Sequence, residues 1–90
     1  MTVHELKIEP VYFDEVRSGA KRFEIRKNDR NFQVGDGVFL KEWDVDHYTG
    51  RYRTFKITFI TDYKQKKKYV VFGIELVNML TYEPNFDNKN

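Results

Sequence analysis

The sequence predicts a mainly β fold of the α+β class: a small β-barrel, mixed or antiparallel, with one early helix packed on it. Two patterns lead to this prediction. Several short segments alternate polar and apolar residues, as strands with one buried face do, whereas only one segment, near the N-terminus, has helical spacing. Closing the sheet would also remove exposed strand edges, which a chain rich in β-forming residues must protect. The 90 residues have room for one domain, which we place at residues 1–80.

The first two predicted elements are a strand and a helix. Residues 4–8 alternate polar and apolar side chains and predict a strand. Pro10 suits the first helical position, where its missing N–H would have no partner, and Gly19 suits the position just after a helix. The helix is therefore predicted over residues 10–18. Its apolar face is predicted to consist of Tyr12, Phe13 and Val16.

After the helix, apolar residues recur at every second position. This predicts a strand with Phe23 and Ile25 on one side and charged residues on the other. Residues 28–31 have the composition of a turn. Residues 32–37 predict a bend that leads into a third strand over residues 38–43.

The C-terminal half is predicted to contain two longer strands. Residues 44–50 are polar and end in Thr49-Gly50, which predicts a loop that closes a hairpin. Strands are predicted over residues 51–63 and 69–76, joined by the lysine-rich segment 64–68. Residues 81–90 are predicted to form a polar, frayed tail. The inward side chains of the last strand are predicted to be Val70, Phe72, Ile74 and Leu76.

Composition is typical of a folded cytoplasmic protein. The hydrophobic share is 40% and the charged share is 33%, which places the chain among globular domains. The absence of cysteine excludes disulfide bonds and thiolate zinc sites and fits a reducing compartment. No apolar run approaches the roughly 18 residues that span a membrane, and the N-terminus lacks a signal-peptide pattern. We expect a cytoplasmic protein with no membrane partner and no cofactor.

Basic residues are concentrated between residues 17 and 30. This segment holds six Lys or Arg and two acidic residues, a local net charge of +4, whereas the whole chain carries +2. Concentrated cations suit phosphate groups, because Lys and Arg that neutralise phosphates release bound counterions. Arginine can also grip a phosphate at two points or stack on a base. The segment is therefore the candidate binding region.

Within this segment, Gly19-x-Lys21-x-x-Glu24-x-Arg26 has the form G-x-K-x-x-E-x-R and resembles the motif of the ASCH group of the PUA-like superfamily. Over roughly residues 3–77 the chain also resembles a small bacterial and phage family, DUF3850. The stretches that carry this second resemblance are residues 4–8, 23–30, 32–36, 48–51 and 69–71. The resemblance implies a PUA-like β-barrel with a helix beside a cleft. The motif residues would line that cleft, as in ASCH domains proposed to bind RNA.

Glu24 needs an explanation, because a carboxylate repels phosphate. Three roles are open: it orients Arg26 or Lys21 through a charge-assisted hydrogen bond, it accepts a hydrogen bond from a base edge, or it acts as a general acid or base beside Lys21. The alternative without a binding role is a ladder of ion pairs on an exposed strand face. Each such pair contributes about 0–1 kcal/mol.

Four further residues complete the predicted site. His4 and Lys7 lie on the first strand, where His4 can read a base, move a proton or serve only the structure. Arg22 and Arg30 flank or follow the motif and can reach a phosphate. The predicted nucleic-acid-binding set is His4, Lys7, Lys21, Arg22, Glu24, Arg26 and Arg30.

Residues around the predicted 44–50 loop offer two further kinds of chemistry. Aromatic rings there can stack on bases, although core packing or hairpin pairing is the favoured interpretation for most of them; they are Trp43, Tyr48 and Tyr52. Three potential metal ligands in the loop match no defined spacing, so no metal is predicted; they are Asp44, Asp46 and His47.

The leading functional hypothesis is a small domain that binds RNA or a nucleotide-like ligand. The second hypothesis is an enzyme that acts on a modified nucleoside. Some ASCH-like proteins are amidohydrolases for N4-acetylcytidine and use the motif lysine, a threonine three positions later and a distant glutamate. Here Lys21 matches but Glu24 takes the threonine position, so an enzyme would use these two residues in a different chemistry. The third hypothesis is a protein-interaction module.

Overall fold

In the computed structural model, residues 2–78 and 84–86 are described, and they form a mainly β fold with one short helix. This confirms the predicted fold class. The elements follow one another as β1 (Val3–Ile8), α1 (Pro10–Ser18), β2 (Phe23–Lys27), β3 (Gly37–Asp44), β4 (His47–Thr61) and β5 (Tyr69–Leu76).

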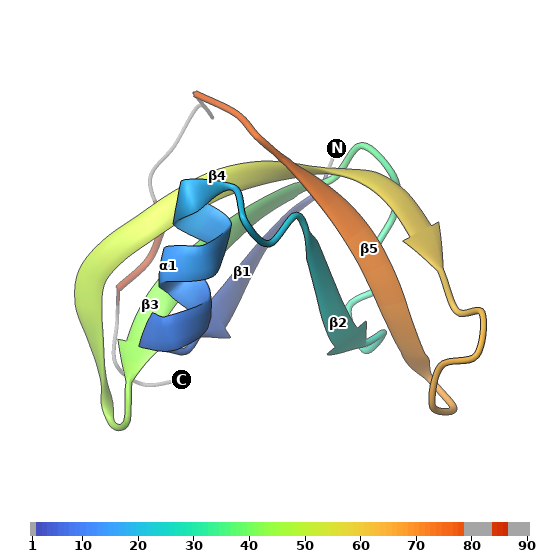
Figure 1. The fold of residues 1–90 in the computed structure, drawn as a ribbon, viewed down its shortest axis with the longest axis horizontal. Coiled ribbons are helices and arrows are strands. Elements are labelled where there is room, and N and C mark those ends of the chain that lie inside the picture. Colours follow the sequence, from blue (N-terminus) through green and yellow to red (C-terminus); the bar gives the residue numbers. More distant parts are fainter. Residues whose placement is uncertain (1, 79–83, 87–90) are drawn as a thin grey trace.

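All five of these strands belong to one curled sheet with the order β1-β3-β4-β5-β2. β1 pairs with β3 in parallel, and the other neighbours are antiparallel. β4 pairs with β3 through residues 47–56 and with β5 through residues 55–61. One strand therefore joins two wings of the sheet, which arches over into a half-barrel (Figure 1).

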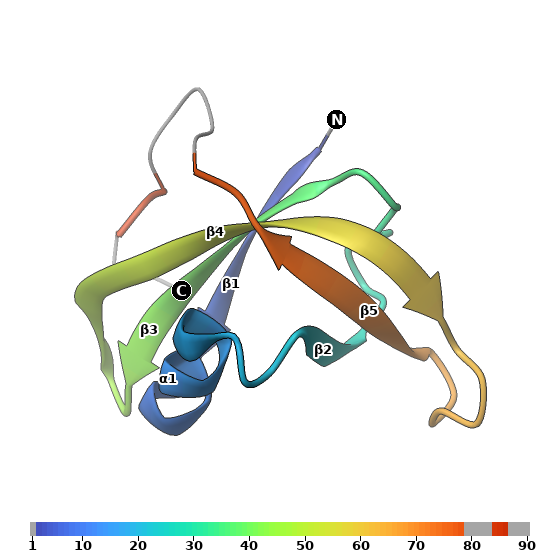
Figure 2. The same cartoon turned by 45° about the horizontal axis from the view of Figure 1, so that its top comes forward.

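The half-barrel has an open side between β1 and β2. These strands are the two ends of the sheet, and they flank its opening in both views (Figure 1; Figure 2). In residues 2–78 and 84–86, β1 pairs only with β3 and β2 only with β5. Each therefore keeps one edge of backbone N–H and C=O groups without a neighbouring strand. We call the gap between these two edges the seam.

The core lies on the concave face of the sheet and is covered by α1. Phe13 and Val16 are the buried residues of the helix. They pack with inward side chains of the sheet and with Phe32 of the β2–β3 connection. Burying one such side chain stabilises the fold by about 1.5–3 kcal/mol. The sheet residues of this core are Leu6, Ile8, Val38, Leu40, Phe55, Ile57, Val70, Phe72 and Ile74.

The helix begins and ends where the sequence predicts. Pro10 occupies its first turn, and Gly19 follows it with a left-handed φ of 86°. The Gly19 N–H donates to the Val16 carbonyl at 3.2 Å. The prediction that Tyr12 belongs to the buried face is wrong, because 49% of its surface is exposed. Buried Phe13 and Val16 are three positions apart, and Tyr12 lies to the side of that stripe.

The predicted polar loop over residues 44–50 is also wrong. β3 continues to Asp44, a turn of only Val45 and Asp46 follows, and β4 begins at His47. Gly50, whose φ is 94°, is not in a turn but in an irregular part of β4. There the register passes from Lys41↔Tyr52 to Trp43↔Tyr48, and the extra residues of β4 include this glycine.

The outer face of β3 is buried as well, under a C-terminal segment. Phe39 and Lys41 point to this face and are buried. The Phe86 ring lies 5.5 Å from the Tyr52 ring, and Pro84 is buried. Most of the predicted 81–90 tail lies outside the described residues, but residues 84–86 contact the sheet. Leu76, predicted to point inward, is instead exposed at the end of β5.

Candidate functional site

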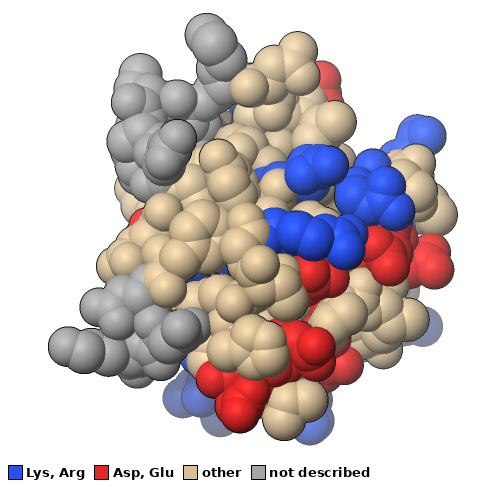
Figure 3. Space-filling model, turned by 90° about the vertical axis from the view of Figure 1, so that its left-hand side faces the viewer, with Lys and Arg blue, Asp and Glu red and all other residues tan. Residues whose placement is uncertain are grey.

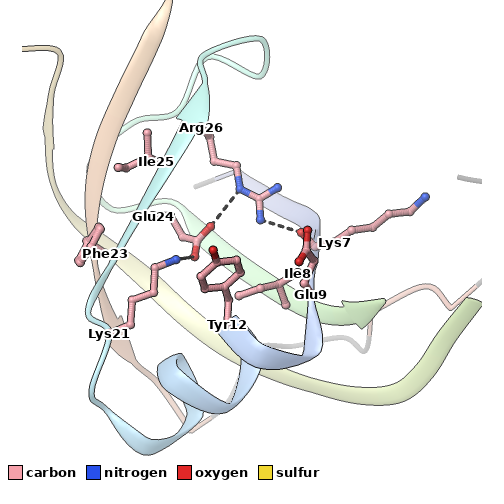
Figure 4. Close-up of a pocket in the computed structure, with 9 residues that line it drawn as sticks. All are labelled: Lys7, Ile8, Glu9, Tyr12, Lys21, Phe23, Glu24, Ile25 and Arg26. Atoms are coloured by element: carbon pink, nitrogen blue, oxygen red, sulfur yellow. Dashed lines mark hydrogen bonds and ion pairs between the residues drawn. The ribbon is translucent and has the colours of Figure 1, made fainter. Parts of the chain in front are cut away.

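A cleft with a volume of about 590 Å³ lies at the seam. On one side it is lined by Lys7 and Ile8 of β1, by Glu9 and by Tyr12 of α1. On the other side it is lined by Lys21 and by residues 23–26 of β2. Its size is within the range of small-molecule sites. Figure 4 shows the lining side chains.

Glu24 is a buried carboxylate in the wall of this cleft, with only 3% of its surface exposed. Its Oε1 accepts a hydrogen bond from Lys21 Nζ at 2.7 Å, and its Oε2 accepts one from Arg26 Nε at 3.0 Å (Figure 4). Strand alternation points Phe23 and Ile25 away from Glu24 and Arg26, and both are exposed at the edge of the cleft. The charged side of β2 therefore faces inward, and the motif residues do not form an exposed ladder.

Arg26 bridges the seam. Its Nε donates to Glu24, and its Nη2 donates to the backbone carbonyl of Lys7 at 2.7 Å (Figure 4). One side chain of β2 thus satisfies a carbonyl on the free edge of β1. Hydrogen bonds in which the donor or the acceptor is charged are stronger than those between neutral groups. Glu24 and Lys7 therefore fix the guanidinium plane against the cleft wall.

Lys21 is held at the mouth of the cleft. Its backbone N–H donates to the Glu15 carbonyl at 3.0 Å, which pins the chain after α1. Its ammonium group lies 5.1 Å from the centroid of the Tyr12 ring and 5.4 Å from that of Phe23. Both distances are within the range of cation–π attraction. Lys21 therefore sits between a buried carboxylate and two exposed rings.

These contacts give Glu24 a positioning role. Each carboxylate oxygen already accepts a hydrogen bond from a cation, so the acid orients Lys21 and Arg26 toward the cleft. Of the three roles considered from the sequence, orientation is the one that the geometry supports. The cleft then offers cationic donors from two directions, a carboxylate between them and an exposed phenol ring at its rim.

Lys7 contributes only its backbone to the cleft. Its side chain points away from the other lining residues (Figure 4), and its ammonium group lies 3.7 Å from the centre of the Trp43 ring. Trp43 and Tyr48 pack edge to face, with ring centroids 4.8 Å apart. The predicted aromatic candidates therefore belong to the opposite face of the β1–β3–β4 wing and not to the cleft.

His4 lies away from the cleft and has a structural partner. It is buried, and its Nε2 donates to Asp36 Oδ2 at 2.8 Å. Its ring lies 4.7 Å from that of Phe32. Asp36 also accepts hydrogen bonds from the backbone N–H groups of Gln33 and Thr2. Desolvation raises the pKa of Asp36, but the hydrogen bonds from His4, Gln33 and Thr2 together hold it below its usual value.

Asp36→Asn is expected to lower the free energy of unfolding by about 2 kcal/mol at pH 7, the typical value of a charged hydrogen bond. Because the pKa of Asp36 is lowered by folding, its stabilisation is complete above the unfolded pKa of about 3.9 and is lost as pH falls through the folded pKa. Urea unfolding between pH 3 and pH 7 should therefore show a smaller acid loss in this variant. Asp29→Asn, in the exposed turn, is the control. Equal pH profiles for Asp36→Asn and wild type would contradict the assignment.

The remaining predicted residues lie outside the cleft. Arg22 is exposed, and its Nε donates to the Gly19 carbonyl at 3.1 Å. Arg30 is exposed in the turn after β2. The structure thus brings together Lys21, Glu24 and Arg26. The sequence did not predict Tyr12 as a residue of the cleft, because its apolar ring suggested a place in the core. Its position next to Phe13, to the side of the buried stripe of α1, was the signal that could have indicated an exposed ring.

A separate charged cluster joins α1 to β4. Asp14 Oδ1 accepts from Arg51 Nη2 at 3.0 Å and from Arg17 at 3.4 Å. Arg51 Nε is also 3.6 Å from buried Glu42. On the face that carries α1 and the β3–β4 hairpin, Lys and Arg side chains gather directly beside Asp and Glu (Figure 3). The basic groups of this cluster are therefore partly balanced, and we assign it to the packing of α1 on the sheet.

The described part of the chain shows neither a cluster of metal ligands nor a membrane-spanning helix. Residues 2–78 and 84–86 contain no group of three His, Asp or Glu residues that could hold a metal ion. None of the helical residues described forms a segment long and apolar enough to cross a membrane.

Comparison with known proteins places the sequence in a family. Residues 3–74 match the family described as a domain of unknown function, DUF3850. The chain belongs to the DUF3850 family. The match covers β1 to most of β5, and so it includes every residue that lines the cleft. The cleft therefore lies within the DUF3850 domain and not in a segment outside it.

A curated relative comes from Escherichia phage P2. An "Uncharacterized 12.9 kDa protein in GpA 3'region" is 47% identical to this chain over 60 residues, which are 67% of this chain and 55% of that protein. The chain thus matches little more than half the length of that relative. The DUF3850 assignment and this similarity leave the function to be inferred from the site.

Proposed function

We propose that this protein is a small RNA-binding domain of PUA-like, ASCH type, which holds an unpaired base in the cleft at the seam. The observation that carries the proposal is the buried Glu24 carboxylate, which holds two cations at the wall of an open cleft. Such an arrangement suits a ligand that is itself rich in hydrogen-bond donors and acceptors. A base edge has this character, and its flat face suits an aromatic ring.

Three features of the cleft support a base as the ligand. Arg26 and Lys21 supply N–H donors held in fixed directions. The two strand edges supply backbone N–H and C=O groups that no strand within residues 2–78 and 84–86 pairs. The exposed Tyr12 ring supplies a stacking face, and stacking on an aromatic ring contributes about 1–3 kcal/mol per base.

The sequence motif adds support by analogy. Gly19, Lys21, Glu24 and Arg26 have the spacing of the motif of ASCH domains, which have been proposed to bind RNA. An RNA ligand also agrees with the cytoplasmic location expected from the cysteine-free sequence. Fold and motif alone do not determine function, so the proposal depends on the geometry of the cleft.

Glu24→Gln tests the proposal. We expect at least a roughly ten-fold loss of affinity for a short single-stranded RNA of mixed sequence. Without the carboxylate, Lys21 and Arg26 are no longer held toward the base, and losing one charged hydrogen bond to the ligand costs about 1.5–3 kcal/mol. A surface that binds phosphates only by net charge would instead bind RNA more tightly after loss of an acidic group. Fluorescence anisotropy at fixed salt measures the change. Tighter binding by this variant would therefore refute the proposal.

Glu15→Gln is the matched control. It makes the same chemical change on the exposed side of α1, outside the cleft. We expect its RNA affinity to equal or slightly exceed that of wild type. Thermal melting of both variants shows whether the fold is retained, and an NMR titration with cytidine or adenosine tests base binding without phosphate. Shifts confined to residues 7–12 and 21–26 are expected.

A further inference from the structure

A second pocket, of about 400 Å³, lies where α1 ends. Its walls are the last turn of α1 with the residues that follow it, Phe55 of β4, and residues 74–76 of β5. Lys21 lines both this pocket and the cleft, so the two adjoin at that residue. Adjoining pockets suit consecutive parts of one ligand chain.

The two pockets differ in charge. In the cleft, Lys21 and Arg26 share Glu24, and Glu9 adds another carboxylate. The Lys7 side chain points away (Figure 4). The cationic and acidic side chains that face the cleft are therefore balanced, which suits an uncharged polar group such as a base.

The second pocket has a cationic excess. Arg17 and Arg22 line it with the single acid Glu75, and the ammonium group of Lys21, which lines both pockets, is already bound to Glu24. Glu75 lies opposite Lys56 in the β4–β5 register, where opposite charges attract. The positive charge that the motif segment carries is thus presented here and not in the cleft.

Arg22 is the cation best placed to bind an anion. Its Nε donates to the Gly19 carbonyl, which fixes the side chain, and its two terminal amino groups have no partner among residues 2–78 and 84–86. Arg17, by contrast, also contacts Asp14. A guanidinium group with free terminal N–H donors is suited to bidentate contact with phosphate. Val16, Phe55 and Ile74 give the pocket an apolar floor, which suits the carbon face of a sugar.

We infer that the second pocket binds the sugar–phosphate unit next to the base held in the cleft, and that Arg22 contacts its phosphate. This inference rests on the proposed RNA-binding function and assigns a different part of the RNA to each pocket. The cleft binds the base, and the pocket at the end of α1 binds the sugar–phosphate backbone. Lys21 lies between the two. Binding would then require a nucleotide within a single strand, since a duplex keeps its bases stacked inside.

Arg22→Gln is the test, with a single-stranded RNA nonamer of mixed sequence as the probe. Loss of one phosphate contact to a single strand should lower the slope of log K against log salt by about 0.7, which is about a five-fold loss of affinity at 0.1 M salt. The NMR response to free cytidine or adenosine should stay unchanged. Arg22→Lys should keep part of the affinity, because it keeps the charge but loses the fork. Arg22 is exposed, so all variants should fold, and thermal melting checks this.

Lys67→Gln is the matched control. It removes one exposed charge from the β4–β5 connection, away from both pockets. If Arg22→Gln changes the salt slope no more than this control, the inference is wrong. If Glu24→Gln weakens RNA binding but Arg22→Gln does not exceed the control, only the second pocket fails. If Glu24→Gln binds RNA as tightly as wild type or more tightly, the proposed function fails as well.

Discussion

Phe72→Ala should lower the free energy of unfolding by about 3–5 kcal/mol, the range measured for deleting a buried aromatic side chain. Phe72 lies in the core of β5 with no exposed surface, and its ring is 4.9 Å from that of Phe32. It also lies opposite Glu24 in the β2–β5 register. A cavity here would therefore loosen the support of the cleft as well as the core. Since a domain of this size is stabilised by about 5–10 kcal/mol, most of the stability would be lost.

Phe59→Ala is the matched control for this prediction. The same atoms are removed from β4, but Phe59 is 61% exposed, and surface substitutions usually change stability by less than about 0.5 kcal/mol. In urea unfolding, the midpoint concentration should be much lower for Phe72→Ala than for Phe59→Ala. The dependence of the unfolding free energy on urea concentration should be similar for the two variants. Similar midpoints would mean that the concave face does not carry the core.

Glu5→Ala should cost about 3 kcal/mol, because it leaves a buried ammonium group without its acid. Lys41 is 5% exposed, and its Nζ donates to Glu5 Oε1 at 2.9 Å and to the Asn85 carbonyl at 2.6 Å. The Tyr48 ring lies 4.6 Å from the same ammonium group. Glu5 Oε1 also accepts from the Asn85 N–H. Its removal would thus weaken the attachment of Asn85 to the sheet.

Lys41→Met should be much less harmful, close to neutral. Methionine fills a similar volume and removes the buried charge, and Glu5, whose side chain is 29% exposed, can still reach water. The double variant Glu5→Ala with Lys41→Met should be more stable than Glu5→Ala alone. Thermal melting of the three variants measures these differences. A double variant no more stable than Glu5→Ala would show that the acid acts through Asn85 and not through the lysine.

Local sequence signals predicted the elements well. Pro10 and Gly19 bracket α1 because both residues act through their own backbone chemistry, which needs no tertiary context. The alternation of β5 gave its bounds correctly. The motif spacing also predicted that Glu24 and Arg26, two apart on β2, share a side. Lys21 precedes the strand, and its long side chain reaches the same carboxylate.

The failures arose where tertiary packing decides. The alternation of β2 does not reveal that the charged side faces inward, because a strand at an open seam can turn either face to the cleft. His4 could not be assigned from its strand position, since its partner Asp36 is 32 residues away. Gly50 looked like a turn residue, but a left-handed φ also suits an irregularity inside a strand.

The seam between β1 and β2 has a consequence for behaviour in concentrated solution. Free strand edges ordinarily recruit a second chain and lead to aggregation. Here the two edges flank the same cleft. On the β1 edge, the Arg26 guanidinium group donates a hydrogen bond to the Lys7 carbonyl. An incoming strand would have to displace that charged bond and enter between the two edges. The Arg26 hydrogen bond therefore protects the β1 edge of the seam against pairing with a second copy of the chain.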